Sequence, residues 1–184
     1  MKISVFIDNS NVFKNIKRIQ EDDPEWTNFY NPLILAQKIA GNRELVDVNF
    51  YCTRPPSYLL GEDVRHKKIY KVTNRYYAAV EKIEGVTVKY GELKGGRGSP
   101  QEKNLDTQLT GDLVADAALS KFDAAIIVSS DGDYVGAVDN AKKFGKKIEV
   151  VSFKGFSSMR LRQICDVSRR ARRSFFQPLD FKRD

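Results

Sequence analysis

Short apolar runs alternate with helical patterns along the whole chain, and this alternation constrains the fold more than any other feature. The apolar, strand-like runs cover residues 3–8, 46–52, 86–90, 124–129 and 147–153. Between and after them, apolar residues recur at the spacing of amphipathic helices over residues 10–20, 32–40, 62–83, 105–121, 133–144 and 157–173. Strands that alternate with helices form a mostly parallel sheet with helices on both faces. The sequence therefore predicts an α/β fold with three layers, α/β/α, around a five-stranded, mostly parallel sheet.

Length and composition limit the classes of protein to which the chain can belong. A chain of 184 residues, 41% of them hydrophobic, is expected to form one soluble domain with a single core. The longest apolar runs are too short to cross a membrane, and the first strand begins too early to leave room for a signal peptide. Two cysteines, Cys52 and Cys165, fit small buried residues of a cytoplasmic protein. The single histidine, His66, excludes a Cys/His zinc site.

Five aspartates occupy strand ends or the starts of helices. They are Asp8 at the end of the first strand, Asp106 and Asp112 in the helix from residue 105, and Asp131 and Asp133 directly after the fourth strand. In a parallel sheet the carboxyl ends of the strands share one edge, and ligands bind in the crevice beyond it. Clustered carboxylates repel one another unless a cation neutralises them, and Mg²⁺ or Mn²⁺ prefers such hard oxygen ligands. This pattern predicts metal-assisted chemistry on phosphates.

Each acid also has an interpretation that needs no metal. Asp8 is equally suited to cap the helix that follows it, and Asp106 lies in a first helical turn, where the helix dipole favours an acid. Asp112 differs because it lies within about 20° of Leu105, on or beside the apolar stripe of its helix. A carboxylate buried there requires a paired charge or a cation. The metal hypothesis therefore depends on the joint arrangement of the acids.

Positive charge is concentrated in the C-terminal segment and in a glycine-rich loop. The chain carries a net charge of +7, and residues 154–184 account for +6 of it with nine Lys or Arg and three Asp. This distribution attracts a polyanion such as nucleic acid, although a solvated basic helix face has the same composition. The side chains expected to contact a nucleic acid backbone are Lys94, Arg97 and Lys103 in loop 91–104, and Arg160 and Arg162 in the C-terminal segment.

Four runs of sequence occur in the order found in a known family. They are Phe6-Ile-Asp8-Asn-Ser-Asn11, Lys103-Asn-Leu-Asp106-Thr-Gln-Leu-Thr-Gly-Asp112, Ile126-Ile-Val-Ser-Ser-Asp131-Gly-Asp133-Tyr and Gly145-Lys-Lys-Ile-Glu-Val-Val151. Together they resemble the NYN domain, a branch of the PIN-like nuclease superfamily. Residues 158–166 are also similar to the last helix of that family. The resemblance implies a Rossmann-like sheet and RNA cleavage, with residues 1–166 as the nuclease domain and 167–184 as a basic extension.

The resemblance also implies roles for single residues. Asp8, Asp106 and Asp131 would bind the metal directly or through water, and Asp112 and Asp133 would complete the catalytic cluster. Asn11, Lys103 and Ser130 would contact the substrate; Asn11 is also suited to hold Asp8 in place. Two positions differ from the family pattern: Ser130 stands where glycine is frequent, and Tyr134 where phenylalanine is common.

The predicted activity is hydrolysis of single-stranded RNA by a water that Mg²⁺ or Mn²⁺ activates. One histidine excludes a mechanism with two histidines as acid and base. Four tyrosines are candidates for stacking a base: Tyr30, Tyr58, Tyr90 and Tyr134. Two other classes stay open, a non-catalytic RNA-binding module on the same fold and a phosphatase whose acidic loop resembles Asp131-Gly-Asp133. The phosphatase needs a second acid where Ser10 stands. A homo-oligomer, a protein partner and a toxin–antitoxin pair are also open.

Overall fold

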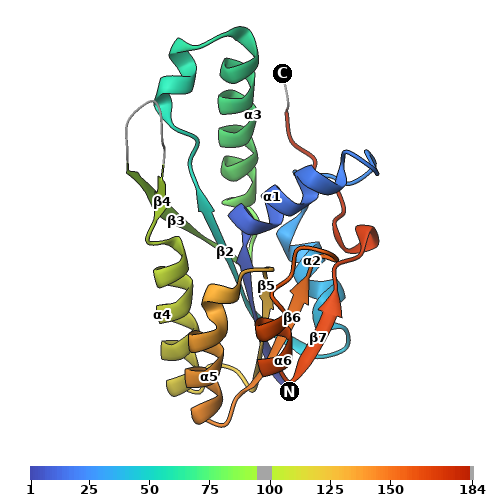
Figure 1. The fold of residues 1–184 in the computed structure, drawn as a ribbon, viewed down its shortest axis with the longest axis vertical. Helices are drawn as coiled ribbons and strands as arrows, with labels where there is room; N and C mark the ends of the chain where they lie inside the picture. Colours follow the sequence, from blue (N-terminus) through green and yellow to red (C-terminus); the bar gives the residue numbers. More distant parts are fainter. Residues whose placement is uncertain (95–100, 183–184) are drawn as a thin grey trace.

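Within the described part of the chain, seven strands form a single sheet, which lies at the centre of the molecule (Figure 1). The computed structural model describes residues 1–94 and 101–182. The strands are β1 (Lys2–Asp8), β2 (Glu44–Thr53), β3 (Val86–Lys94), β4 (Gln101–Lys103), β5 (Ala124–Val128), β6 (Lys147–Ser152) and β7 (Val167–Arg170). They lie in the order β4-β3-β2-β1-β5-β6-β7, and all neighbours are parallel except the pair β3 and β4. The prediction of an α/β fold with a mostly parallel sheet is confirmed.

The predicted number of five strands is wrong, because β4 and β7 were not expected. Strand β4 has three residues and pairs antiparallel with β3, so it has no apolar pattern of its own. Strand β7 lies inside residues 157–173, where we predicted one helix. That helix, α6 (Met159–Ile164), ends early because the backbone turns extended at Cys165. The next residues pair with β6, whose outer edge would otherwise expose unpaired backbone groups.

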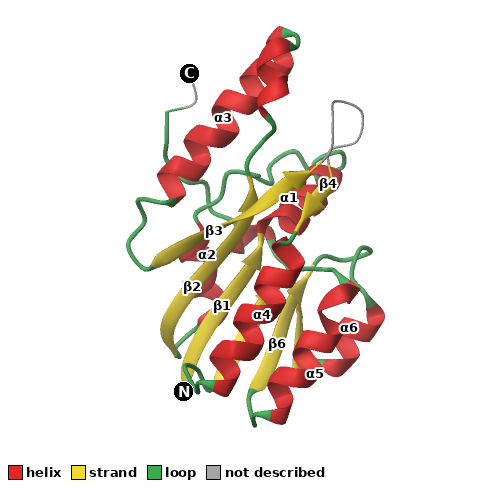
Figure 2. Ribbon diagram, turned by 90° about the vertical axis from the view of Figure 1, so that its left-hand side faces the viewer, coloured by secondary structure: helices red, strands yellow, loops and turns green. Residues whose placement is uncertain are grey.

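Helices cover both faces of the sheet (Figure 2). One face carries α1 (Asn9–Ile19), α2 (Pro32–Ala40) and α3 (Val64–Val80), and the other carries α4 (Leu105–Ala118), α5 (Val135–Lys143) and α6. Side chains of a strand alternate between faces. Ile3, Val5 and Ile7 of β1 therefore join the core under α1, α2 and α3, and Phe6 joins the core under α4 and α5. The three predicted layers are confirmed.

Helix α3 reaches beyond the carboxyl ends of the strands (Figures 1 and 2). It follows β2 through a short 3₁₀ turn, η1 (Ser57–Gly61), and returns to the start of β3. The helix contains five Lys or Arg residues and no Asp or Glu. Its buried side chains occur at helical spacing: Val72, Thr73, Tyr76, Tyr77 and Val80. The remaining face, which carries the basic side chains, is turned to solvent.

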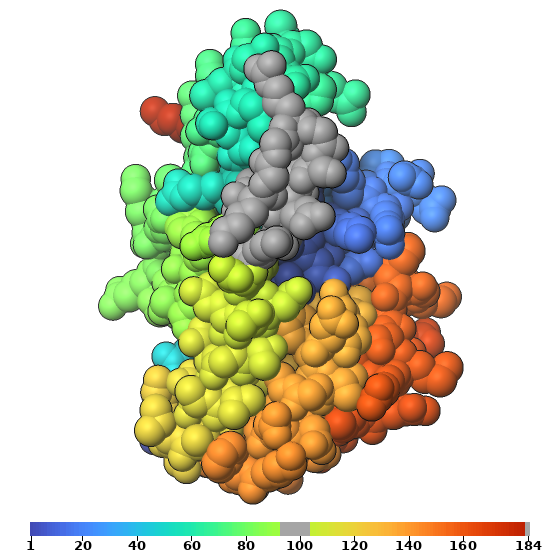
Figure 3. All heavy atoms as spheres, turned by 60° about the vertical axis from the view of Figure 1, so that its left-hand side comes forward, coloured from blue at the N-terminus to red at the C-terminus, as the bar shows by residue number. Residues whose placement is uncertain are grey.

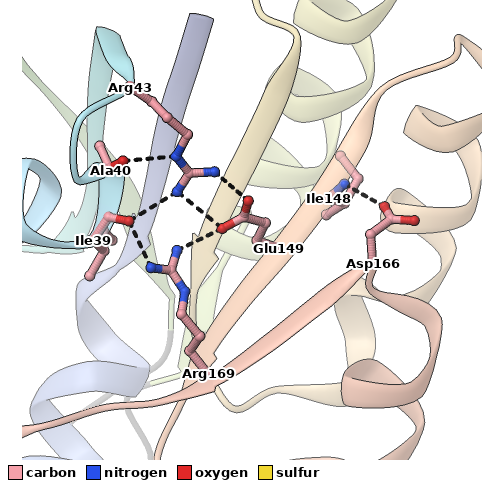
Figure 4. A network of polar contacts seen from close by, with 7 residues as sticks. All are labelled: Ile39, Ala40, Arg43, Ile148, Glu149, Asp166 and Arg169. Carbon is pink, nitrogen blue, oxygen red and sulfur yellow. Dashed lines mark hydrogen bonds and ion pairs between the residues drawn. The ribbon is translucent and has the colours of Figure 1, made fainter. Parts of the chain in front are cut away.

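The C-terminal segment, which includes β7 and the residues after it, packs against the rest of the domain. After β7, the 3₁₀ turn η3 (Arg173–Phe175) leads to Phe176, which is buried in the core under α2. Glu149 on β6 accepts hydrogen bonds from Arg43 and from Arg169 of β7, and both arginines also donate to the carbonyl of Ile39 (Figure 4). This network joins β7 to the end of α2. The expected boundary at residue 166 therefore falls before residues that complete the sheet.

Two arginines of the C-terminal basic block have carboxylate partners. Arg169 binds Glu149 at 2.6 Å, and Arg173 binds Glu25. These two arginines are neutralised within the fold, so residues 154–184 offer less positive charge to a ligand than their composition suggests. Cys52 and Cys165 are buried, as expected, and they form no disulfide. Within the described residues, no helix combines the length and the apolar character needed to span a membrane.

Candidate active site at the carboxyl edge of the sheet

The carboxyl edge has one point where the direction of chain connection reverses. From β1 the chain proceeds to β2 and β3 on one side, and it returns through α4 to β5 on the other side of β1. In open α/β sheets, ligands bind at such a switch point. Ile7 pairs with Val128, so the residues that follow, Asp8 and Ser129, are neighbours across the two strand ends. Asp8 therefore lies at the position where this topology favours a site.

Asp8 is a buried carboxylate with hydrogen bonds to both oxygens. Its Oδ1 accepts from the backbone N–H of Asn11 at 3.0 Å, so it does cap α1 as one interpretation predicted. Its Oδ2 lies 3.0 Å from the hydroxyl oxygens of both Ser129 and Tyr134. Burial raises the pKa of Asp8 to about 7; the charge of Asp106 adds to the rise, while the three hydrogen bonds oppose it.

Asp106 joins Asp8 through the hydroxyl of Tyr134. The Tyr134 oxygen lies 2.7 Å from Asp106 Oδ1 and 3.0 Å from Asp8 Oδ2. Because a phenol carries one proton, it can donate to only one of the two carboxylates. The other short contact suits a carboxylate that carries its own proton, a form that the raised pKa of Asp8 favours. Burial and the two neighbouring acids also raise the pKa of Tyr134 well above its usual range, so the phenol itself stays protonated.

Asp131 lies at the same edge of the sheet and is connected to Asp8 through Ser129. Its backbone N–H donates to Ser129 Oγ at 3.1 Å, and that hydroxyl donates in turn to Asp8. Its carboxylate accepts from the backbone N–H of Asp133 at 3.0 Å and so caps the 3₁₀ turn η2 (Gly132–Tyr134). The loop places Asp131 beside Asp8, but its carboxylate is turned toward the start of the next helix.

Asp112 and Asp133 lie apart from the pair of Asp8 and Asp106. Asp112 forms an ion pair with Lys89 at 2.7 Å and accepts from the hydroxyl of Tyr51 at 2.8 Å. Lys89 thus supplies the counter-charge that the position of Asp112 on its helix requires. Asp133 is exposed and lines a separate depression with Arg160 of α6. Within residues 1–94 and 101–182, no three His, Cys, Asp or Glu side chains are grouped closely enough to hold a metal.

Comparison with protein-family models shows the family to which the chain belongs. The model of the NYN domain matches residues 2–170, nearly the whole chain. This chain belongs to the NYN domain family. The structure of a protein of unknown function from Vibrio parahaemolyticus RIMD 2210633 is similar to this NYN domain, with a TM-score of 0.62, 17% sequence identity and coverage of 95% of this chain and 94% of that one. At that identity the likeness concerns the fold, and no curated protein matches the chain.

A polar groove adjoins the acids of this NYN domain. Asn11 links the two, because its backbone N–H binds Asp8 and its Oδ1 accepts from the backbone N–H of Ser130 at 2.9 Å. Ser130 is also fixed from the other side, since its Oγ accepts from the backbone N–H of Phe153 at 3.0 Å. These bonds bring together the ends of β1, β5 and β6. The groove is lined by Asn11, Lys14, Asn15, Arg18, Ser130, Asp131, Gly132, Gly155, Phe156, Ser157 and Ser158.

The remaining basic residues that we expected at the site are spread over other parts of the chain. Lys94 ends β3 and Lys103 ends β4, one residue before the turn into α4, whereas Arg97 lies outside the described residues. Arg160 and Arg162 are exposed on α6, away from the groove lining. Their expected contacts with substrate remain predictions.

Sequence reasoning missed several residues of the site and its groove. Tyr134 was considered as a base-stacking residue, but it is buried and bridges two acids; Tyr30 is buried as well. The sequence did indicate a polar role for Tyr134, because it adds a hydroxyl beside an acidic loop where phenylalanine is common in the family. Lys14 and Arg18 could have been found from their helical spacing to Asn11. Phe156 gave no signal, because only the packing of its loop exposes its ring beside the acids.

Proposed function

We propose that this NYN domain is a metal-dependent ribonuclease that hydrolyses phosphodiester bonds of single-stranded RNA. One observation carries the proposal: Asp8 from β1 and Asp106 from α4 share the Tyr134 hydroxyl at the switch point of the sheet. Membership of the NYN family, a branch of PIN-like nucleases, supports the same reaction class. The groove with Lys14 and Arg18 beside the acids suits a polyanionic substrate.

The donor set fits a small divalent cation. Mg²⁺ keeps several waters and binds through one or two carboxylates together with substrate phosphates, so it does not need a cage of three acids. Asp8 and Asp106 would supply the carboxylates, and Asp131 would bind through a water. Burial raises the pKa of Asp8 because it disfavours the charged carboxylate, and a bound cation would relieve that cost as a proton does. When bound, Mg²⁺ or Mn²⁺ would supply an activated water and shield the charge of the scissile phosphate.

Residues of the chain position this pair. Ser129 and the backbone of Asn11 fix the two oxygens of Asp8, and the Tyr134 hydroxyl fixes the spacing of Asp8 and Asp106. Tyr134 is fully buried, so its hydroxyl contacts both carboxylates from the side of the core. The side chains therefore hold the acids in one orientation before substrate arrives, which lowers the cost of reorganisation during the reaction.

Cleavage assays with and without metal test the proposal. Labelled single-stranded RNA should be cut in Mn²⁺ or Mg²⁺ and stay intact in excess EDTA, and single-stranded DNA of the same sequence tests the preference for RNA. Asp8→Asn and Asp106→Asn should each lower the rate at least about 100-fold, because an amide cannot replace a carboxylate at a metal. Exposed Asp22, changed to Asn, serves as control and should keep full activity. Cleavage that persists in excess EDTA would rule out the mechanism.

A non-catalytic RNA-binding module is the second candidate. It is favoured by the absence, within the described residues, of a group of three metal-binding side chains. The same Asp8→Asn variant separates the two functions. A nuclease loses turnover with this substitution, whereas a pure binder has no turnover to lose and keeps its affinity for RNA.

A further inference from the structure

An exposed aromatic ring stands in the groove beside the acids. Phe156 is 40% exposed, and the groove that it lines has a volume of about 410 Å³, which is within the range of ligand sites. Because the exposed ring lines the groove, it can contact a ligand that binds there. In Figure 3 the blue surface of the N-terminal segment lies beside the orange surface of this part of the chain.

The loop that presents Phe156 is fixed at both ends. Backbone N–H groups of Phe153 and Ser158 donate to the Oγ and the carbonyl of Ser130, each at 3.0 Å. Gly155 has a φ of +81°, which lets the chain turn directly before the ring. The loop also packs so closely that a Cβ on Gly132 would lie 2.9 Å from Ser158 Oγ. Phe156 therefore lies on an ordered loop that is hydrogen-bonded to Ser130, just after the end of β5 and close to Asp8.

The opposite wall of the groove is a basic face of α1. Lys14 and Arg18 follow Asn11 by three and seven residues, so the three side chains lie along one side of the helix. At 1.5 Å per residue, Lys14 and Arg18 lie about 4.5 and about 10.5 Å along the axis from Asn11. Neither forms an ion pair with a carboxylate in the part of the chain that the structure describes. The Arg18 guanidinium lies 5.3 Å from the centre of the Phe156 ring.

These features match the way proteins bind single strands, with a positive groove for the backbone and an aromatic ring for a base. We propose that this groove is a binding subsite for single-stranded nucleic acid, in which Phe156 stacks one base while Lys14 and Arg18 contact the adjoining phosphates. The inference deepens the proposed function and rests on it for the direction of the strand toward Asp8 and Asp106. A stacked base would fix the register of the strand relative to these acids. The chemistry is shared by RNA and DNA, and the experiment distinguishes them.

Equilibrium binding in excess EDTA tests the subsite without cleavage. The probes are fluorescently labelled single-stranded RNA and DNA dodecamers of one sequence. Phe156→Ala should weaken binding by about 5- to 150-fold, the usual loss for a stacked base, and Phe156→Trp should restore it. Phe144→Ala is the matched control: Phe144 is 49% exposed but ends α5 at the opposite edge of the sheet, so its loss should leave affinity unchanged.

Salt dependence tests the two basic residues. For single strands, each phosphate contact adds about 0.7 to the slope of log affinity against log salt concentration. Lys14→Ala and Arg18→Ala should each lower the slope by about that amount, while Phe156→Ala should leave the slope nearly unchanged. A dodecamer with single abasic positions should bind the wild type and Phe156→Ala equally when the missing base is the stacked one.

The outcomes separate the subsite from the proposed activity. Equal affinity of wild type and Phe156→Ala for both probes, or no detectable binding by the wild type, overturns the subsite even if metal-dependent cleavage is found. Weakened binding by Phe156→Ala supports the subsite even if no cleavage is found in Mg²⁺ or Mn²⁺. A loss with RNA but not with DNA assigns the subsite to RNA, and an equal loss with both assigns it to single strands in general.

Discussion

At the scale of single residues, Asp8 combines a structural and a chemical role. It caps α1 through Asn11, yet its burial beside Asp106 makes its charge costly. The unfolded chain releases the Asp8 proton near pH 3.8, whereas the folded protein holds it to about pH 7. Between these values the folded state binds more protons than the unfolded state, so the free energy of unfolding falls as pH rises. Above pH 7 the full penalty is present, about 4 kcal/mol.

The Asp8→Asn variant should reveal this penalty. An amide cannot ionise, so in EDTA the variant should be more stable than the wild type at pH 8, by up to about 4 kcal/mol, and similar to it near pH 4. Urea unfolding at both pH values measures the difference. Adding Mg²⁺ at pH 8 should then stabilise the wild type more than the variant, because a cation that binds only the folded state raises its stability. The same difference at both pH values would contradict the titration of Asp8.

At the scale of elements, ion pairs as well as backbone hydrogen bonds hold β7 to the sheet. The Glu149 side chain is only 9% exposed and serves both Arg43 and Arg169. The three side chains connect β6, β7 and the end of α2 (Figure 4). Removing the one acid would leave two arginines close together without a counter-charge, which is the costly way to break a buried ion pair.

Glu149→Gln should therefore lower the free energy of unfolding by about 3 kcal/mol. The control is Asp139→Asn, which breaks the exposed helical pair of Asp139 and Lys143 and should cost less than about 0.5 kcal/mol. Urea midpoints of the two variants give the comparison. Equal midpoints would mean that the network adds nothing beyond a surface ion pair.

At the scale of the whole molecule, the folding unit extends past the region that matches the family model. The match ends at residue 170, but the chain continues to Phe176, which is 3% exposed. The Phe176 ring lies 5.1 Å from that of Tyr30 and 5.4 Å from that of Trp26, measured between centroids. Farther on, Phe181 contacts Phe29 and Tyr76. The residues after β7 therefore close the core under α2 and α3.

Phe176→Ala should cost about 4 kcal/mol, the usual loss for a buried aromatic side chain. Phe144→Ala, at an exposed position, should change stability by less than about 0.5 kcal/mol. Thermal unfolding of both variants, followed by circular dichroism, tests this expectation. If Phe176→Ala unfolds at the temperature of the wild type, residues after 170 are an appendage and not part of the core.

The sequence predicted the elements whose patterns are local. Helix α2 occurs as predicted over Pro32–Ala40, because Asn31 caps it and proline suits its first turn. Strands β1, β5 and β6 lie within one or two residues of the apolar runs, since a strand buried on both faces must be apolar throughout. The short β4 and the edge strand β7 have no such requirement. Their strand conformation comes from pairing with β3 and β6, so local patterns could not predict it.

What the sequence by itself determined is the order of strands and helices and the presence of acids at the strand ends. Tertiary structure decided how those acids are used. Asp8 and Asp106 meet on one hydroxyl, Asp112 is neutralised by a lysine of β3, and Asp131 turns its carboxylate to cap a helical turn. The physical reason is that burial and charge pairing depend on contacts between separate segments, such as Asp8 and Ser129, which are 121 residues apart along the chain. Topology places an acid at the edge of the sheet, but its neighbours decide whether it remains available to a cation.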